Sequence, residues 1–249
     1  FEKEITQIDF IKLLIKISSS LWLNETDTFN EIISSLGEKE KEIFDTLENS
    51  LLKEGNNKLS DFGYYFGSSF HYEGENYWGV DRLNHLEDRL SELNLRRENS
   101  QPYIINYSQN NFNLENLDQG QIDLQVEFFP SLNSPYTYIS FKRIREIFEK
   151  YPVKFEVKPV LPMLMRNMKI PPVKAKYILS DAAREGRKHG VIIKKIYSPI
   201  GKPAERAYSL FPIINDQGYG FDYLEKLMDS CFFYGENIGE MKYLEKTIS

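Results

Sequence analysis

Cysteine is almost absent from this chain of 249 residues, since Cys231 is the only one. A single cysteine excludes an intrachain disulfide, a C-x-x-C dithiol and a cysteine-rich metal site. Cys231 stands in the apolar stretch MDSCFFYG, so we expect it to be a small buried hydrophobic residue and not a nucleophile. A reducing, cytoplasmic location is therefore the default expectation.

Histidine and long apolar runs are also scarce. The three histidines, His71, His85 and His189, are scattered and form no H-x-x-x-H pair with a carboxylate, so little supports a metal site. No apolar run approaches the ~20 residues that a membrane-spanning helix needs. The first residues, FEKEITQ, lack the basic and then apolar plan of a signal peptide. We therefore expect no membrane partner.

Charge is unevenly spread along the chain, although the total of −6 is modest. Between Tyr151 and Ser209 there are 13 Lys or Arg against 4 Asp or Glu, so this segment carries +9 and the remainder carries −15. The basic segment is either a solvated surface or the wall of a pocket for a small anionic ligand. A nucleic-acid partner is disfavoured because the overall balance is acidic and no nucleic-acid-binding motif occurs.

The N-terminal part of the chain shows helical spacing of its apolar residues. The elements expected there are helices from Asp9 to the serines at 18–20, from Thr26 or Asp27 to Gly37, and over 38–54 with a stop at Gly55. After these helices, the β-favouring residues 68–72 and 76–78 flank a short Gly-containing connection and predict a β-hairpin. A helix with leucines at helical spacing follows and is expected to end near Leu95.

The second half begins after a polar, asparagine-rich stretch, 99–120, which is typical of a linker or a long surface loop. The elements expected beyond it are a strand over 124–129, a helix over 135–151, a strand over 153–157, and helices over 173–189, 204–215 and 221–233. Strand, helix and strand of this length form a βαβ unit, whose two strands lie parallel in one sheet. The pattern indicates an α/β fold that is rich in helix.

The turn between the first of these strands and its helix carries the main candidate for chemistry. Pro135 is tolerated as the first helical residue because its missing N–H would have no partner there, so Ser134 falls at the N-cap. Unpaired N–H groups and the helix dipole favour an anion at that position, such as a thiolate or a carboxylate. Ser134 is thus either a plain helix cap or a cap that faces an anion.

Two stretches resemble one family, the DsbA-like thioredoxin-fold proteins that include the 2-hydroxychromene-2-carboxylate isomerases and the kappa-class glutathione transferases. The first is FFPSLNSPYTY, which is similar to the family's strand, turn and helix with a Ser-Pro-Tyr signature. Where dithiol members carry C-P-x-C, this chain has Ser134-Pro135-Tyr136-Thr137. Downstream, the residues that match the family are Lys174, Tyr177, Asp181 and Arg184.

The second stretch is GENYWGVDRLNHLEDRL, which is similar to the family's closing hairpin and helix with its W-G-x-D-R-L signature, here Trp78 to Leu83. The resemblance implies a thioredoxin-like fold of the DsbA and kappa type with a large helical insertion. The family's cis-proline before the hairpin is missing, since the chain reads Phe66-Gly67-Ser68-Ser69. A cis bond without proline costs about 3–4 kcal/mol, so we expect a trans bond there.

The order of the two stretches is reversed relative to a single-domain member, in which the Ser-Pro-Tyr strand comes first. One interpretation is a tandem protein seen in part. Residues 1–98 would then hold a helical layer with the C-terminal hairpin and helix of one thioredoxin-like domain, 99–122 the linker, and 123–249 the N-terminal βαβ and helical part of another. The other interpretation is a single permuted sheet, in which 68–72 pairs with 124–129.

The resemblance implies that glutathione is the cofactor and that its sulfur lies near Ser134. Ser134 would stabilise the thiolate by donating a hydrogen bond and would not itself be the nucleophile. The cofactor-binding residues that the resemblance implies are Asn133, Pro135, Tyr136, Asn167, Lys174, Asp81 and Arg82. Lys174, with Arg166 and Asn167, would hold the glutathione carboxylates or an anionic substrate, unless these cations are simply solvated. For Asp81 and Arg82, the alternative is a first-turn acid and a salt bridge.

Two functions stay open on these observations. The first is a glutathione-dependent isomerase or transferase that acts on a small anionic or aromatic substrate, with a homodimer left open. The second is a catalytically silent thioredoxin-fold scaffold or partner-binding protein. A dithiol oxidoreductase mechanism is excluded by the single cysteine, and a Ser-His-Asp hydrolase by the lack of a paired histidine and of a G-x-S-x-G motif.

Overall fold

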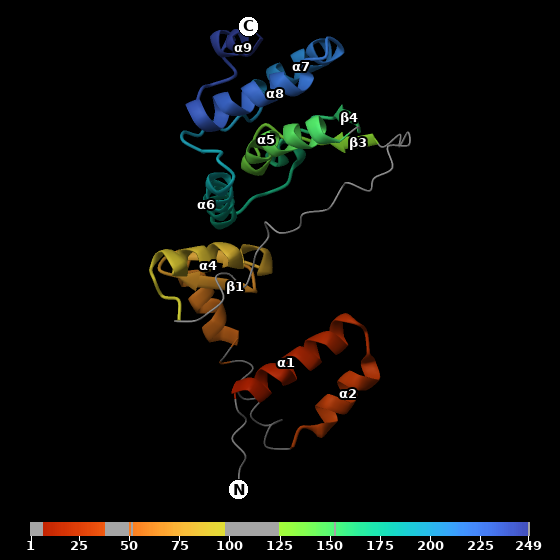
Figure 1. Ribbon diagram of the computed structural model, residues 1–249, viewed down its shortest axis with the longest axis vertical. Coiled ribbons are helices and arrows are strands. Elements are labelled where there is room, and N and C mark those ends of the chain that lie inside the picture. The colour runs from red at the N-terminus through yellow and green to blue at the C-terminus, as the bar shows by residue number, and fades with distance from the viewer. Residues whose placement is uncertain (1–6, 38–49, 51, 98–124, 152, 249) are drawn as a thin grey trace. The chain divides into compact units, whose positions relative to one another are not determined.

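Helices predominate in the computed structural model (Figure 1), which describes residues 7–37, 50, 52–97, 125–151 and 153–248. The chain divides into two compact units, Phe1–Asp61 and Phe62–Ser249. The hairpin and the helix after it therefore belong with the C-terminal part of the chain, which differs from the division around 99–122 expected from the sequence. The asparagine-rich segment itself lies outside the described residues.

The first unit contains α1 (Gln7–Trp22), α2 (Thr26–Ser35) and a helical stretch over 52–61. Helix α1 runs through the serines at 18–20, where the sequence pattern weakens, because the Ser20 hydroxyl donates to the Ile17 carbonyl at 2.9 Å and so is satisfied within the helix. The N-cap of α2 is Glu25 and not Thr26 or Asp27.

The helix expected over 38–54 lies mostly outside the described residues. Its expected stop at Gly55 is wrong, because the helical stretch over 52–61 continues through this glycine. A single glycine inside a helix costs only about 1 kcal/mol relative to alanine. It does not end a helix without a further signal.

The second unit opens with the predicted hairpin, β1 (Ser69–Tyr72) paired antiparallel with β2 (Glu75–Trp78). Tyr72 lies opposite Glu75, so the turn has two residues, and both Glu73 and Gly74 adopt positive φ, as a type I′ turn requires. The 3-10 turn η1 (Val80–Arg82) and helix α4 (Leu83–Glu92) follow. No cis bond occurs among the described peptide bonds, which confirms the trans bond expected before the hairpin.

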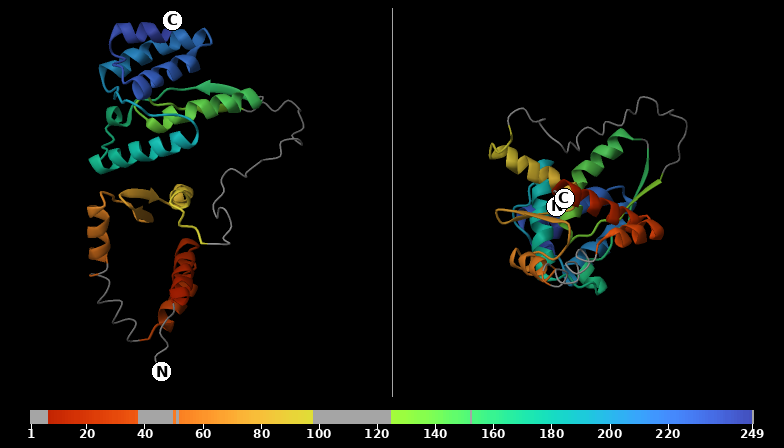
Figure 2. Two further views of the ribbon diagram at one scale, coloured as in Figure 1. Left: turned by 60° about the vertical axis from the view of Figure 1, so that its left-hand side comes forward. Right: turned by 90° about the horizontal axis from the view of Figure 1, so that it is seen from below.

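The predicted βαβ unit is confirmed as β3 (Gln125–Phe128), α5 (Pro135–Lys150) and β4 (Lys154–Val157), with the strands parallel and Val126 opposite Phe155. Figure 2 shows α5 alongside this sheet. Phe128 packs edge-on against Phe141 of α5, with ring centroids 5.5 Å apart. This aromatic contact fixes the strand to the helix that follows it.

The remaining elements are η4 (Met163–Arg166), α6 (Pro172–Lys188), α7 (Lys202–Asp216), α8 (Gly220–Asp229), the π-helical turn η5 (Ser230–Tyr234) and α9 (Met241–Ile248). The helices expected over 173–189, 204–215 and 221–233 are therefore confirmed. Helices α7, α8 and α9 pack together and cover the βαβ unit (Figures 1 and 2). None of the described helices is long and apolar enough to cross a membrane.

The main hydrophobic core lies between α5, α7 and α8, with Phe141, Leu224 and Leu227 almost wholly buried. Cys231 belongs to this core, and burial raises the pKa of its thiol to about 12. A thiol of that kind is protonated at neutral pH. The prediction that Cys231 is a buried hydrophobic residue is confirmed.

The described strands form two separate two-stranded sheets, β1 with β2 and β3 with β4. The permuted sheet in which 68–72 would pair with 124–129 is therefore not present among the described strands. The two halves of the second unit nevertheless meet, because the hairpin and α4 pack on α6. The contact between them is made of side chains rather than of a shared sheet.

Candidate functional site

Ser134 is the N-cap of α5, as predicted, with an extended backbone (φ −104°, ψ 113°). Its Oγ accepts a hydrogen bond from the Thr137 N–H at 3.2 Å, and its carbonyl accepts from the Tyr138 N–H at 3.1 Å. Its own hydroxyl hydrogen has no acceptor in the described part of the chain. Since Pro135 has no N–H, the donors at this helix end without an acceptor in the described part of the chain are the Ser134 hydroxyl and the Tyr136 N–H.

Tyr208 of α7 makes hydrogen bonds that fix the turn that carries Ser134. The Tyr208 hydroxyl accepts from the Leu132 N–H at 3.0 Å and donates to the Val160 carbonyl at 2.9 Å. It thus joins the turn after β3 to the segment after β4. Burial raises the pKa of Tyr208 to about 12, so the hydroxyl stays protonated and can make both bonds. Beside Ser134, the Asn133 Oδ1 accepts from the Ser198 hydroxyl at 2.8 Å.

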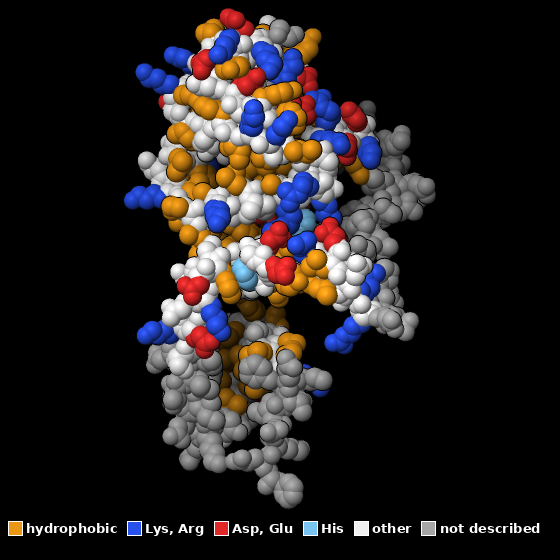
Figure 3. Space-filling model, turned by 90° about the vertical axis from the view of Figure 1, so that its left-hand side faces the viewer, with side chains coloured by type: hydrophobic (Ala, Val, Ile, Leu, Met, Phe, Trp, Pro, Cys, Tyr) orange, Lys and Arg blue, Asp and Glu red, His pale blue; other side chains and the backbone are white. Residues whose placement is uncertain are grey.

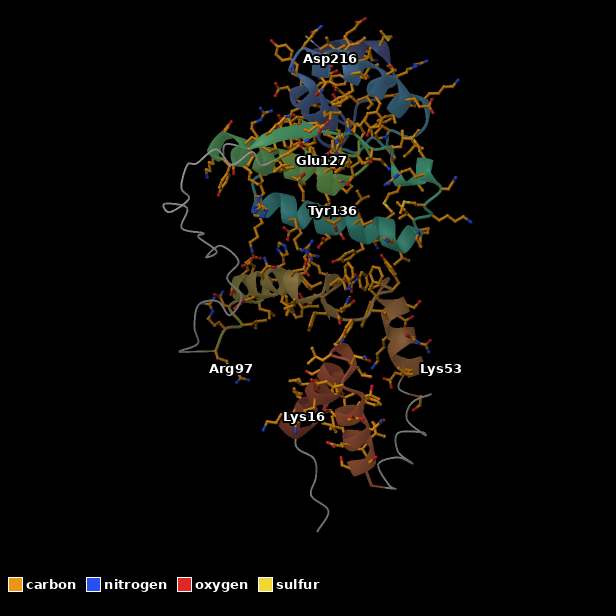
Figure 4. All side chains as sticks on the ribbon, turned by 90° about the vertical axis from the view of Figure 1, so that its right-hand side faces the viewer. Lys16, Lys53, Arg97, Glu127, Tyr136 and Asp216 are labelled. Carbon is orange, nitrogen blue, oxygen red and sulfur yellow. The ribbon has the colours of Figure 1, made fainter. Side chains whose placement is uncertain are left out.

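Tyr136, the second residue of α5, points to a buried carboxylate on α6. Its hydroxyl donates to Asp181 Oδ2 at 2.6 Å, and the Tyr177 hydroxyl lies 3.3 Å from Oδ1 (Figure 4 labels Tyr136). Arg82 from η1 donates its Nε–H to both carboxylate oxygens, at 3.0 and 3.1 Å. Asp181 is only 1% exposed, so three donors from three different elements surround a buried carboxyl group.

The two tyrosines of this cluster are donors and not bases. Burial, together with the nearby charge of Asp181, raises the pKa of Tyr177 to about 12. Burial and the hydrogen bond to Asp181 raise the pKa of Tyr136 as well. Each hydroxyl therefore keeps its proton at neutral pH and stabilises the carboxylate charge.

Charged side chains line the contact of the hairpin and α4 with α6. His85 Nε2 lies 2.5 Å from Glu185 Oε1, and Lys188 pairs with Asp88 at 3.0 Å. Arg184 donates to the carbonyl of Asn76. Figure 3 shows acidic, basic and histidine side chains gathered on one face of the molecule.

The remaining residues implied by the resemblance lie in three places. Asp81 is bound to Arg82 Nη1 at 2.7 Å, which matches the salt-bridge interpretation. Lys174, in the first turn of α6, has its Nζ 5.9 Å from the ring centroid of Phe66. Asn167 adopts a left-handed conformation (φ 59°) at the end of η4. Neither of the last two residues is bonded to Ser134 in the described ranges.

The structure brings Tyr136 and Arg82 together through Asp181, a connection that sequence reasoning missed. The available signal was the spacing of Tyr177, Asp181 and Arg184 on α6, because residues four and seven apart lie on one face of a helix. The role of Tyr208 left no comparable signal. Its partners are 48 and 76 residues away in the chain.

The fit of glutathione to these residues is uneven. Ser134 fits the thiolate, because it is an oriented hydroxyl donor at a helix N-terminus. Arg82 does not fit a glutathione carboxylate in this arrangement, because its guanidinium is bound to Asp181 and Asp81. Lys174 is half-buried and near an aromatic ring, so it remains the cation suited to that role.

No protein-family model matches the chain, and no curated protein matches it either.

Proposed function

We propose that the unit Phe62–Ser249 contains parts of a thioredoxin-like fold of the DsbA and kappa type, in two separate sheets, and that it is a glutathione-dependent isomerase or transferase. The observation that carries the proposal is the hydrogen bonding of Ser134. Its Oγ is fixed by the Thr137 N–H, and its hydroxyl hydrogen remains to be donated to an anion. A thiolate at this position would receive that hydrogen bond and the field of α5.

Ser134 acts in this proposal as a stabiliser of the thiolate. Accepting a bond from Thr137 polarises the Ser134 hydroxyl and strengthens it as a donor. Glutathione, when bound, would supply a nucleophilic thiolate that adds reversibly to an unsaturated aromatic carboxylate. A cytoplasmic location, expected from the single cysteine, would provide the reduced form.

Lys174 is the residue that we assign to an anionic group of glutathione or of the substrate. It lies in the basic segment and is half-buried over Phe66. The neighbouring Phe66 and Trp78 rings stack, with centroids 4.4 Å apart, and the Tyr65 ring meets Phe66 at a tilt, with centroids 4.1 Å apart. A cation beside stacked rings suits an aromatic carboxylate.

The test is calorimetric titration of the protein with reduced glutathione and with S-methylglutathione, which lacks the thiol. We expect wild type to bind glutathione more tightly than the methylated analogue, and Ser134→Ala to remove that difference. The ultraviolet absorbance of the bound thiolate reports the thiol pKa, which should rise in Ser134→Ala. Ser140→Ala is the matched control, because the Ser140 hydroxyl donates a hydrogen bond to the Thr137 carbonyl within α5, at 2.8 Å.

A second candidate function is a silent scaffold, and one observation favours it. Arg82, which the resemblance assigns to glutathione, is committed to the internal contact with Asp181. If neither glutathione nor its methylated analogue binds to the folded wild-type protein, the scaffold is the better description. Equal binding of both ligands would remove the role given to Ser134.

A further inference from the structure

A cavity of about 440 Å³ lies on the side of α5 that carries Tyr138 and Lys142. Its other walls are the segment 190–192, helix α8 and the π-helical turn η5. A volume of this size falls in the range that holds small ligands. Neither Ser134 nor Asp181 lines it, so it is separate from the site described above.

Four aromatic side chains line this cavity. Tyr138 is fixed by stacking on Phe232, at 5.4 Å between centroids, and by its hydroxyl, 3.3 Å from the Ile192 carbonyl. Phe233 and Tyr234 come from the π-helical turn, and their rings meet edge to face at 5.0 Å. A π-helical turn is rare and occurs frequently at functional sites.

Two carboxylates share the cavity with these rings, and they differ in their partners. Glu225 is bound by Arg145, whereas Asp229 has no Lys or Arg within 4.0 Å among the described residues and has the Tyr138 hydroxyl as its polar neighbour. Burial and the charge of Glu225 raise the pKa of Asp229. A half-buried carboxylate beside a second carboxylate is stabilised by a cation.

We propose that this cavity binds a small organic ammonium ion with an aromatic body. The ammonium group donates to the Asp229 carboxylate, and the aromatic body packs against Tyr138 and Phe233. Aromatic faces attract cations. Two rings of the cavity already have a lysine ammonium nearby, since Lys194 lies 5.3 Å from the Phe233 centroid and Lys246 lies 4.4 Å from the Tyr234 centroid.

Lys142 also lines the cavity, and its positive charge would favour an anionic ligand over a cationic one. If Lys142 and not Asp229 determined the charge of the ligand, an aromatic carboxylate would bind in preference to an aromatic amine. The two hypotheses therefore predict opposite orders of affinity for an aromatic amine and an aromatic carboxylate of the same size.

The experiment compares benzylammonium, benzyl alcohol and benzoate, titrated into the full chain at neutral pH and followed by calorimetry. Benzylammonium should bind about tenfold more tightly than benzyl alcohol, because only the cation makes a charge-assisted hydrogen bond to Asp229. Benzoate should bind least. Equal affinities, a preference for benzoate, or no binding of any probe would overturn the proposal, and this comparison needs no variant.

Asp229→Asn supplies the second arm. It should weaken benzylammonium binding about tenfold and leave benzyl alcohol unchanged, since the loss is of charge and not of volume. Asp222→Asn is the control, because Asp222 lies on the same helix, pairs with Arg145 at 2.7 Å and does not line the cavity. An equal effect of the two substitutions would contradict the role of Asp229.

Discussion

Asp181 is a carboxyl group that the fold has buried, and its partners satisfy it there. Arg82 supplies the opposite charge, and Tyr136 and Tyr177 supply the further donors. Removing one partner of such a pair costs more than the pair contributes, because the other is left buried and uncompensated. The cluster is therefore sensitive to the loss of a single charge.

Asp181→Asn is expected to lower the free energy of unfolding by roughly 3 kcal/mol, because the Arg82 guanidinium loses its buried carboxylate partner and keeps only the more exposed Asp81 and Glu185. Urea denaturation followed by circular dichroism measures this loss. Asp88→Asn is the control, since Asp88 pairs with Lys188 at the surface and should cost less than about 1 kcal/mol. Equal losses in the two variants would show that the buried cluster contributes no more to the free energy of unfolding than the surface pair does.

At the scale of elements, the turn between β3 and α5 depends on a side chain from α7. The Tyr208 hydroxyl bonds the Leu132 N–H and the Val160 carbonyl, so it positions the turn that ends in Ser134. Tyr208→Phe leaves two backbone groups without their partner, which should cost about 1–3 kcal/mol in unfolding free energy. It should also weaken glutathione binding, because Ser134 loses its support.

Tyr223→Phe separates positioning from stability in that experiment. The Tyr223 hydroxyl donates to the Ala207 carbonyl in the same core, at 2.8 Å, and makes no hydrogen bond to the turn among the described residues. We expect this variant to lose stability and to keep its affinity for glutathione, measured by calorimetry. If both variants bound glutathione equally well, Tyr208 would be a stabilising residue alone.

Most elements were predictable because their signals are local. The β-hairpin was signalled by β-favouring runs on either side of Glu73-Gly74, and α5 by Ser134-Pro135 at its start. The π-helical turn η5 was not foreseen, because nothing in SCFFY differs from ordinary helical sequence. The passage of a helix through Gly55 was missed because a preference of about 1 kcal/mol is easily overridden.

The candidate site was predictable only where its chemistry is local. Ser134 as an N-cap follows from the residue after it. The bonds of Arg82 and of Trp78 to α6 join residues 99 positions apart, and no periodicity encodes them. The sequence therefore indicated which side chains were unusual, but not that Arg82 would be bound to Asp181.

At the scale of the whole molecule, helix α6 joins the two parts of the second unit, because both the hairpin and α4 are bonded to it. Within that contact, His85 hydrogen-bonds Glu185, and Arg82 and His189 each lie 3.8 Å from its oxygens. The hydrogen bond with His85 holds the pKa of Glu185 below its usual range. Protonating Glu185 removes the negative charge that faces His85, Arg82 and His189. Acid should therefore weaken the contact of α4 with α6.

The sign of the pH dependence follows from that lowered pKa. The folded state binds fewer protons at Glu185 than the unfolded state does, so the stabilisation is present above the unfolded pKa of about 4.3 and is lost as pH falls through the folded value. Wild type should therefore be more stable than Glu185→Gln at neutral pH, and the urea midpoints of the two should converge in acid. Glu54→Gln, in an exposed pair with Lys58 in the first unit, should follow wild type at every pH. A gap between wild type and Glu185→Gln that stays constant with pH would mean that the carboxylate charge does not stabilise the contact of α4 with α6.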